Sequence, residues 1–324
     1  SNIDTRADLT FILAQAETRT TQADAIFDGL ATVKGKADSK GLMWALGNNR
    51  RALGILATTA DGKQYYELDK EMNLIAKEDT ETAEYIEDKF AVPSDVINIE
   101  ENSVLIVDQK GRRWRLPLGD ERYKEKIEKA ELRICREVST ERDLFSCFGT
   151  FYELPAENAD GFAKIRPVSS HKFAINDYAS YRGMMMLTGI EHAKAKGNPH
   201  IVISEDGKAA VWAGAIDDLW KLGKPVGHGG PWLETEVKAR EKSDPFLIGF
   251  YDKREMTLSH AASSEVVFTV EVDPTGDGQW FKYADFEVKP GASFKHKFPK
   301  AFQARWIRVS TNVDTKATVS FEYR

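Results

Sequence analysis

Residues 200–225 read HIVISEDGKAAVWAGAIDDLWKLGKP, and this stretch decides the fold class. Two apolar runs, HIVIS and AAVWAGA, lie on either side of the turn residues EDGK. Asp-Gly between two strand-like runs is a strong hairpin signal. The stretch therefore predicts a strand, a tight turn and a second strand. A further apolar run, MMMLTGI at 184–190, precedes it and predicts another short strand.

The same pattern recurs along the N-terminal two thirds of the chain. Looser copies are ALGILATTADGKQYYELD (52–69), NSVLIVDQKGRRWRLPLGD (102–120) and RDLFSCFGTFYELP (142–155). Their spacing of roughly 35 to 55 residues is the period of a four-stranded propeller blade. We therefore expect residues 1–230 to form a β-propeller-like domain of about five blades, with the first blade incomplete. A β-sandwich with long hairpins is the alternative interpretation of the same repeat.

The character of the sequence changes near Trp232. Four segments after it alternate apolar and polar residues and are separated by Pro/Gly-rich turns: 256–273, 280–298, 304–311 and 317–324. Period-two alternation is typical of half-buried strands, so we expect residues 231–324 to form an antiparallel β-sandwich. The predicted fold class is all-β, and VGHGGPW (226–232) is the expected seam between the two domains.

Composition excludes several classes of protein. The 324 residues are 42% apolar, and the formal net charge is −6, which argues against a nucleic-acid-binding protein. There is no uninterrupted apolar run of about 18 residues, so no membrane span is expected. The two cysteines, Cys135 and Cys147, are expected to be buried thiols, with one bridge between neighbouring strands as the alternative. The six histidines are scattered and no Cys-x-x-Cys pair exists, so neither a metal site nor a cofactor is predicted.

Four segments carry a resemblance to a known group of proteins: ALGNNRRALGILA (45–57), SYRGMMMLTGI (180–190), DDLWKLGKP (217–225) and GGPW (229–232). Together they resemble secreted proteins of polysaccharide-degrading bacteria, of Bacteroides and planctomycete type, that pair a β-propeller with a C-terminal β-sandwich. The resemblance implies a carbohydrate ligand and a place outside the cytoplasm: secreted, periplasmic or on the cell surface. It also implies a longer protein, whose N-terminal portion would be a partner of this chain.

The richest polar segment is HKFAINDYASYRG (171–183). His171, Asp177 and Tyr181 are the candidate catalytic residues, because His, Asp and Tyr side chains can exchange protons with a substrate. Arg182 is a candidate for holding a uronate or sulfate group through two parallel hydrogen bonds. The alternative is a strand whose polar groups face solvent.

Two further segments offer candidate substrate-binding residues. In NNRR (48–51), Asn48 and Arg51 suit hydroxyl and carboxylate recognition, although a solvated turn is the alternative. In DDLW, Asp217 is a candidate polar contact, and Trp220 could stack on a sugar ring. Adjacent carboxylates such as those at 217–218 cannot by themselves be the pair of a glycosidase, which lies about 5–10 Å apart across the sugar. A turn and a buried domain interface are the alternatives for these residues.

The combined features predict a carbohydrate-active protein, either a glycoside hydrolase or a polysaccharide lyase acting on an acidic polysaccharide at the propeller axis. The alternative is a non-catalytic glycan-binding or scaffold protein. An enzyme needs two titratable groups from different repeats in one cleft, whereas a binding protein needs only exposed polar and aromatic groups.

Overall fold

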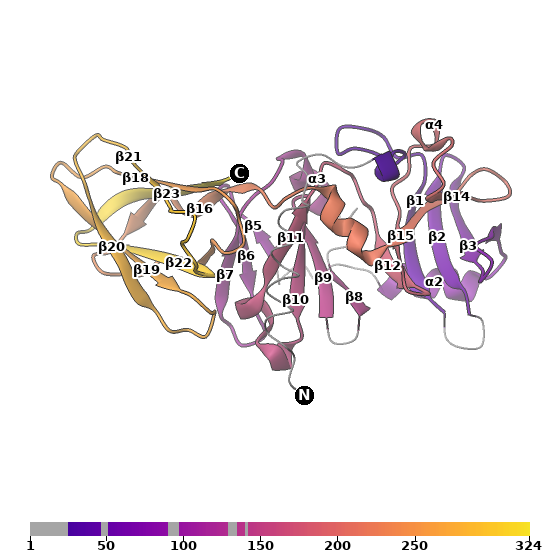
Figure 1. The fold of residues 1–324 in the computed structure, drawn as a ribbon, viewed down its shortest axis with the longest axis horizontal. Helices are drawn as coiled ribbons and strands as arrows, with labels where there is room; N and C mark the ends of the chain where they lie inside the picture. Colours follow the sequence, from indigo (N-terminus) through magenta and orange to yellow (C-terminus); the bar gives the residue numbers. More distant parts are fainter. Residues whose placement is uncertain (1–24, 47–50, 90–96, 129–134, 140–141) are drawn as a thin grey trace. The chain divides into compact units, whose positions relative to one another are not determined.

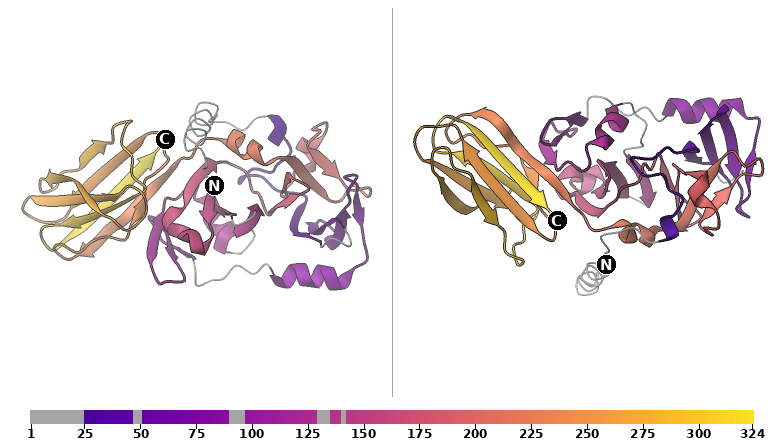
Figure 2. Two further views of the ribbon diagram at one scale, coloured as in Figure 1. Left: turned by 60° about the horizontal axis from the view of Figure 1, so that its bottom comes forward. Right: turned by 90° about the horizontal axis from the view of Figure 1, so that it is seen from above.

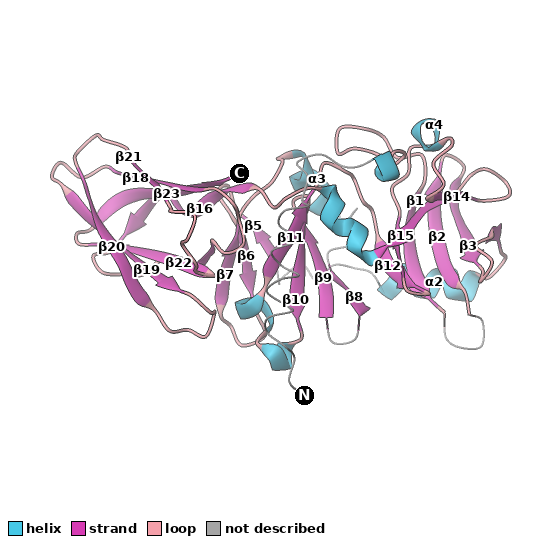
Figure 3. Ribbon diagram, in the orientation of Figure 1, coloured by secondary structure: helices cyan, strands magenta, loops and turns pink. Residues whose placement is uncertain are grey.

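A computed structural model describes residues 25–46, 51–89, 97–128, 135–139 and 142–324. The chain is all-β, as predicted, with several sheets and a few short helices (Figures 1 and 3). It divides into two compact units. Unit 1 takes in Ser1–Val92, Arg122–Tyr152 and Val168–Lys224, and unit 2 takes in Pro93–Glu121, Glu153–Pro167 and Pro225–Arg324. The chain passes from unit 1 to unit 2 for the last time between Lys224 and Pro225, close to the expected boundary at residue 230. Because each unit is made of three segments, no single cut in the sequence separates them.

Unit 1 is built on short antiparallel sheets. The first sheet has the order β1-β2-β3-β4, and its strands are β1 (Lys40–Ala45), β2 (Leu53–Thr59), β3 (Gly62–Leu68) and β4 (Leu74–Ala76). A second sheet has the order β12-β13-β15-β14, with β12 (Tyr178–Tyr181), β13 (Met184–Leu187), β14 (Ile201–Ile203) and β15 (Ala210–Ala215). The predicted hairpins at Asp61-Gly62 and Asp206-Gly207 are confirmed as the β2–β3 and β14–β15 connections.

A third four-stranded sheet has the order β11-β10-β9-β8, with β8 (Cys135–Ser139), β9 (Arg142–Cys147), β10 (Thr150–Pro155) and β11 (Arg166–Ser170). The chain leaves unit 1 within β10 and returns to it within β11. Cys147 is a free, buried thiol, and burial raises its pKa to about 12, so it stays protonated at neutral pH. The side chain of Cys135 lies outside the described residues.

The helices are short connectors. Those in the described residues are η1 (Ala25–Phe27), α2 (Thr80–Lys89), α3 (Arg122–Glu128), η2 (Glu157–Ala159), η3 (Gly161–Lys164), α4 (His192–Ala195) and η4 (Ile216–Leu222). The carboxylate of Asp79 accepts the backbone N–H of Thr82 (3.0 Å) and so caps the start of α2. Ile86 of α2 is fully buried against Leu56 and Tyr65, which fixes this helix on the first sheet.

A buried polar seam joins β1 to the chain around β12, and we define it by Asn176, Asp177 and Thr188. Asp177 Oδ2 accepts the backbone N–H of Met43 (2.6 Å), and Asn176 Oδ1 accepts that of Gly41 (2.8 Å). The Thr188 hydroxyl donates to the Gly41 carbonyl (2.7 Å). Strands β1 and β12 belong to different sheets and do not form a backbone hydrogen-bond ladder with each other. These side chains therefore supply the hydrogen-bond partners of the β1 backbone groups on that side.

Unit 2 contains two sheets. One has the order β16-β23-β18-β21, with β16 (Gly227–Val237), β18 (Arg254–His260), β21 (Phe294–Lys297) and β23 (Thr315–Tyr323). The other has the order β20-β19-β22-β17-β7-β6-β5, with β5 (Ile97–Ile99), β6 (Val104–Val107), β7 (Arg113–Leu116), β17 (Phe246–Leu247), β19 (Val266–Asp273), β20 (Phe281–Val288) and β22 (Trp306–Thr311). The C-terminal strands lie in two facing layers (Figure 2). Buried residues alternate along β18, β19 and β23, and Phe246 stacks on Phe321 across the two layers.

The hairpin at 102–120 was expected to be part of a propeller blade, but the structure places it in unit 2. Its strand β7 runs parallel to β17, with Arg115 opposite Phe246, and so continues the sheet of the C-terminal strands. Trp114 packs on Trp306, with ring centroids 4.7 Å apart. The hairpin pattern identified the two strands, but the partner of an edge strand depends on residues far away in the sequence.

A charged cluster secures this junction within unit 2. Asp244 accepts hydrogen bonds from Arg113 (2.9 Å) and from Arg115 (2.8 Å), and the Arg115 side chain is only 9% exposed. Burial opposes ionisation of Asp244, but the hydrogen bonds from Arg113 and Arg115 outweigh it and lower the pKa of the carboxyl. Arg115 also pairs with Glu100 (2.5 Å), so loss of the Asp244 carboxylate would leave its buried guanidinium with one acidic partner instead of two.

Asp244→Asn should therefore lower the unfolding free energy of unit 2 by about 2 kcal/mol at neutral pH, because the charge-assisted hydrogen bonds from both arginines are weakened while Glu100 still pairs with Arg115. Urea unfolding followed by tryptophan fluorescence measures this, since Trp114 and Trp306 lie in the same sheet. Because the carboxyl pKa is lowered in the folded state, the advantage of Asp over Asn should disappear as the pH falls through that pKa. Glu322→Gln, which breaks the exposed pair with Arg324, is the control and should change little. An Asp244→Asn protein as stable as wild type would contradict the role of this cluster.

Candidate functional site

The polar segment 171–183 does not form one site. Phe173 forms a β-bridge with Thr32 at the end of unit 1 where β1 begins. Tyr181 is the last residue of β12 and lies at the opposite end, where β1 ends. The Tyr181 hydroxyl bonds the Arg51 carbonyl, whereas the His171 ring packs on Phe151. His171, Asp177 and Tyr181 consequently occupy three separate environments, and the structure does not bring these predicted catalytic residues together.

His171 lies in an aromatic cluster made with Tyr123, Phe151 and Phe173. Its Nδ1 accepts the backbone N–H of Phe173 (3.1 Å), which leaves the proton on Nε2. The residue as a whole is partly exposed, but the Nε2 atom is inaccessible and has no hydrogen-bond partner among the described residues. Burial lowers the pKa of His171 to about 3, so the ring is neutral at physiological pH.

Asp177 is completely buried. Its two carboxylate oxygens accept the N–H groups of Met43 (2.6 Å) and Tyr178 (2.8 Å). Both contacts are to backbone, so this carboxylate holds strands in place within the polar seam.

Tyr181 brings two predicted segments together at what we call the loop end of unit 1, residues 51, 69–73, 181–183 and 215–217. Its hydroxyl donates to the backbone carbonyl of Arg51 (2.7 Å), although the two residues are 130 positions apart in the sequence. In the next turn, Arg182 donates to the carbonyl of Lys70 (2.7 Å). Burial raises the pKa of Tyr181, so its phenol remains protonated and acts as a donor.

Both arginines at the loop end have left-handed backbone. Arg51 has φ 50° and Arg182 has φ 52°, and Gly183 follows with φ 78°. Two successive positive φ values between paired strands are the geometry of a type I′ hairpin turn, which favours Asn-Gly. A non-glycine residue in this region costs roughly 1 kcal/mol, and Arg has none of the local hydrogen bonding that helps Asn.

The other charges of the loop end are mixed. Asp69 accepts hydrogen bonds from the backbone and side chain of Asn73, and these lower the pKa of the carboxyl. Lys70 pairs with Glu71 (3.2 Å) on the surface. Asp217 is exposed and lies just beyond Ala215, which is in register with Met184 at the Arg182-Gly183 turn. The predicted residue Asn48 lies outside the described residues.

The remaining predicted residue, Trp220, packs against the core of unit 1 from η4 and is only partly exposed. Its neighbour Asp218 is buried, accepts the N–H of Ala215 (2.9 Å) and pairs with Lys221 (3.1 Å). These contacts fix the turn after β15. Asp217 is thus the member of the adjacent carboxylate pair that faces solvent.

The loop end combines exposed guanidinium groups with the carboxylates of Asp69, Glu71 and Asp217. The cations Arg51 and Arg182 are exposed, the Asp69 carboxyl has a lowered pKa, and a protonated Tyr181 is a donor. General acid catalysis needs a carboxyl whose pKa is raised towards neutrality. Within the described ranges, no group of three or more His, Cys, Asp or Glu side chains could hold a metal ion.

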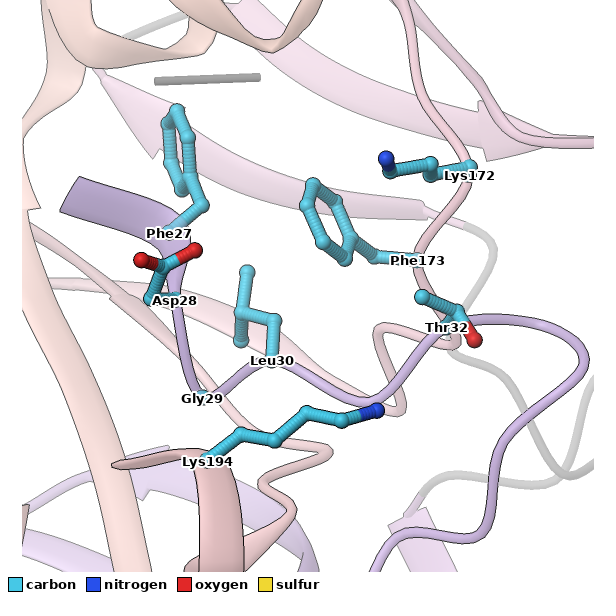
Figure 4. Close-up of a pocket in the computed structure, with 8 residues that line it drawn as sticks. All are labelled: Phe27, Asp28, Gly29, Leu30, Thr32, Lys172, Phe173 and Lys194. Atoms are coloured by element: carbon cyan, nitrogen blue, oxygen red, sulfur yellow. The ribbon is translucent and has the colours of Figure 1, made fainter. Parts of the chain in front are cut away.

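Sequence reasoning missed a cavity at the opposite end of unit 1. It has a volume of about 350 Å³ and is lined by Phe27, Asp28, Gly29, Leu30, Thr32, Lys172, Phe173 and Lys194 (Figure 4). The lining comes from three separate segments, so no local motif marks it. Its only signal in the sequence is Lys172-Phe173, inside the polar segment itself.

Comparisons with known proteins do not identify a family. No protein-family model and no curated protein matches the chain. Solved structures include PirA, at 16% identity over 31% of this chain and 84% of that one, with a TM-score of 0.19. A glycoside hydrolase shares 12% identity over 87% of this chain and 84% of its own, with a TM-score of 0.18. An exo-β-1,3-galactanase from Phanerochaete chrysosporium shares 8% identity over 94% and 100%, with a TM-score of 0.19. Glycoside hydrolases are thus among the neighbours, but likenesses at this level support no conclusion about function.

No helix in the described part of the chain is both long enough and apolar enough to cross a membrane.

The neutral state of His171 predicts a pH dependence of stability. The unfolded chain binds a proton near the ordinary pKa of 6.5, whereas the folded pKa is about 3. Between these values the unfolded state holds more protons, so the unfolding free energy of unit 1 should fall as the pH drops, by at most about 1.4 kcal/mol per pH unit. In His171→Gln, which keeps an acceptor for the Phe173 N–H, this slope should become shallower.

Urea unfolding at several pH values between 3.5 and 7 measures the slope. The matched control is His228→Gln, because His228 is exposed in unit 2. An unchanged slope in His171→Gln would show that the histidine is protonated equally in both states.

Proposed function

We propose that this chain is a carbohydrate-active protein that binds an acidic polysaccharide at the loop end of unit 1. The proposal rests on the hydrogen bond from Tyr181 to the Arg51 carbonyl, which brings the turn of Arg51 next to the turn of Arg182. Both arginines have left-handed backbone. Guanidinium groups recognise carboxylates and sulfates through paired hydrogen bonds, which suits uronate-containing or sulfated chains. Local rules of turn chemistry are most often broken where function requires it.

Binding without turnover is the activity that we propose. Asp177 is occupied by backbone groups, His171 is enclosed and neutral, and Tyr181 donates to a carbonyl. Hydrolysis needs two carboxyl groups flanking the bond, one of them with a raised pKa. Cleavage by a hydrolase or lyase mechanism is the alternative function, and the experiment below separates the two.

We also propose the wider setting of the protein. Repeated four-stranded antiparallel sheets support an incomplete β-propeller in the N-terminal part, and the two facing sheets of unit 2 support a C-terminal β-sandwich. The resemblance to secreted proteins of polysaccharide-degrading bacteria supports a place in the periplasm, on the cell surface or outside the cell, with an N-terminal portion of the same protein as a partner.

The test replaces each arginine by asparagine, which tolerates positive φ. Arg182→Asn and Arg51→Asn should keep or slightly raise the melting temperature, because Asn suits the turn better. Each should weaken binding of polygalacturonate or a sulfated glycan about tenfold by isothermal titration calorimetry, since a charge-assisted contact is lost. Lys36→Gln, an exposed cation at the other end of unit 1, is the control.

The outcomes have distinct meanings. Binding that is equal for neutral and acidic polysaccharides, or unchanged in both asparagine variants, would contradict the proposal. Release of reducing ends or of unsaturated products during the titration would replace the binding function by an enzymatic one.

A further inference from the structure

Two aromatic side chains of unit 2 are each stacked on an arginine at the protein surface. The guanidinium of Arg308 lies over the ring of Trp280, 4.2 Å from its centroid, and that of Arg305 lies over the ring of Phe250, 5.0 Å from its centroid. Phe250 is 40% exposed and Trp280 is partly exposed. Because a guanidinium covers one face of each ring, the face that is open to solvent is the opposite one. We call Phe250 and Trp280 the aromatic pair.

Both rings lie on the same side of the seven-stranded sheet. Trp306 and Arg308 are two residues apart in β22, so their side chains leave the strand on one face. Trp306 and Arg305 both donate hydrogen bonds to backbone carbonyls of segment 163–165 (2.9 Å each). Arg305 therefore reaches the segment that covers this face, and it carries the ring of Phe250 to the side on which Trp280 lies.

The backbone of Phe250 is strained. Its φ of 70° is in the left-handed region, which costs a residue with a bulky side chain roughly 1 kcal/mol. An exposed ring recovers little of this cost by burial, so folding alone gives no reason for a phenylalanine at this position. Strained residues of this kind are concentrated at binding sites.

The charged groups around the aromatic pair are already paired. Arg308 pairs with Glu271 (2.8 Å), and Lys164 pairs with Asp277. Gln279, which directly precedes the tryptophan, adds an exposed amide. Open aromatic faces set among neutralised charges and an amide suit a neutral sugar, whose CH-rich face stacks on a ring and whose hydroxyls bond polar groups. The two carboxylates would repel a polyanion.

We propose that the aromatic pair binds a neutral polysaccharide, with one sugar ring on Phe250 and another on Trp280. The two arginines beneath them are three residues apart, about 10 Å along an extended strand, so a chain of several sugars is needed to reach both rings. A protein partner would need a continuous apolar core, whereas these rings are surrounded by charged and amide groups. The site is separate from the loop end of unit 1 and does not depend on the function proposed there.

Affinity gel electrophoresis of the full chain tests the proposal. The gels contain hydroxyethylcellulose, laminarin, xyloglucan or β-1,4-galactan, and we expect at least one of these neutral polysaccharides to retard the protein. Calorimetry then compares the hexasaccharide and the disaccharide of that polysaccharide. The hexasaccharide should bind about tenfold more tightly, because only the longer chain contacts both rings.

Variants of the aromatic pair make the test specific. Trp280→Ala should weaken binding about tenfold. Phe250→Asn should do the same at an almost unchanged melting temperature, because asparagine tolerates positive φ. Phe281→Ala is the matched control: Phe281 is 56% exposed, but it lies opposite Val272 on the other face of the sheet, so its loss should leave the affinity unchanged.

The proposal would be overturned if none of the four neutral polysaccharides retards the chain, or if Trp280→Ala and Phe250→Asn both bind like wild type. A loss of affinity in Phe281→Ala as large as theirs would also overturn it. Arg182→Asn should leave binding of the neutral polysaccharide intact, and Phe250→Asn should leave binding of polygalacturonate intact. Failure of this site and failure of the loop end can therefore be told apart.

Discussion

Unit 1 depends on the polar seam, in which the side chains of Asn176, Asp177 and Thr188 take the place of a missing strand ladder. Backbone groups of β1 that face β12 would otherwise be buried without partners, at a cost of about 1–3 kcal/mol each. A carboxylate is well suited to this position because its two oxygens can accept two N–H groups at once. The seam holds β1 and β12 in one relative position, and with them the loops at both ends of these strands.

This constraint shapes the two opposite ends of unit 1. At the end where β1 finishes, the turn after β12 meets the chain entering β2, and Tyr181 reaches the Arg51 carbonyl. At the end where β1 begins, Ser39 and Leu30 both bridge Ile190, and the strand-like segment 27–33 covers the aromatic core. The same seam therefore positions exposed guanidinium groups at one end and a cavity beside core aromatic residues at the other.

Local features of the fold could be predicted from the sequence. The all-β class and the Asp-Gly hairpins follow from alternation and turn chemistry, which depend on neighbouring residues. The partner of the hairpin at 102–120 could not be predicted in this way, because β7 joins β17 through contacts with Phe246, Asp244 and Trp306. The polar segment 171–183 shows a similar limit. His, Asp and Tyr occur both in catalytic groups and in structural hydrogen-bond networks. Only their burial and their hydrogen-bond partners distinguish the two roles, and the sequence shows neither.

The discontinuous make-up of unit 2 has a consequence for synthesis on the ribosome. Strands β5, β6 and β7 leave the exit tunnel long before β17, so the edge of β7 that will pair with β17 is open during translation of all of Val168–Lys224. An open strand edge next to the apolar ring of Trp114 is a template for pairing between nascent chains. Glu100 is translated before β7 and can pair with Arg115 at once, whereas the Asp244 partner of Arg113 is translated much later. Arg113 therefore leaves a positive charge on that edge, and like charges on two nascent chains repel each other. The charged cluster that stabilises the finished sheet therefore also disfavours pairing between nascent chains at the open edge of β7.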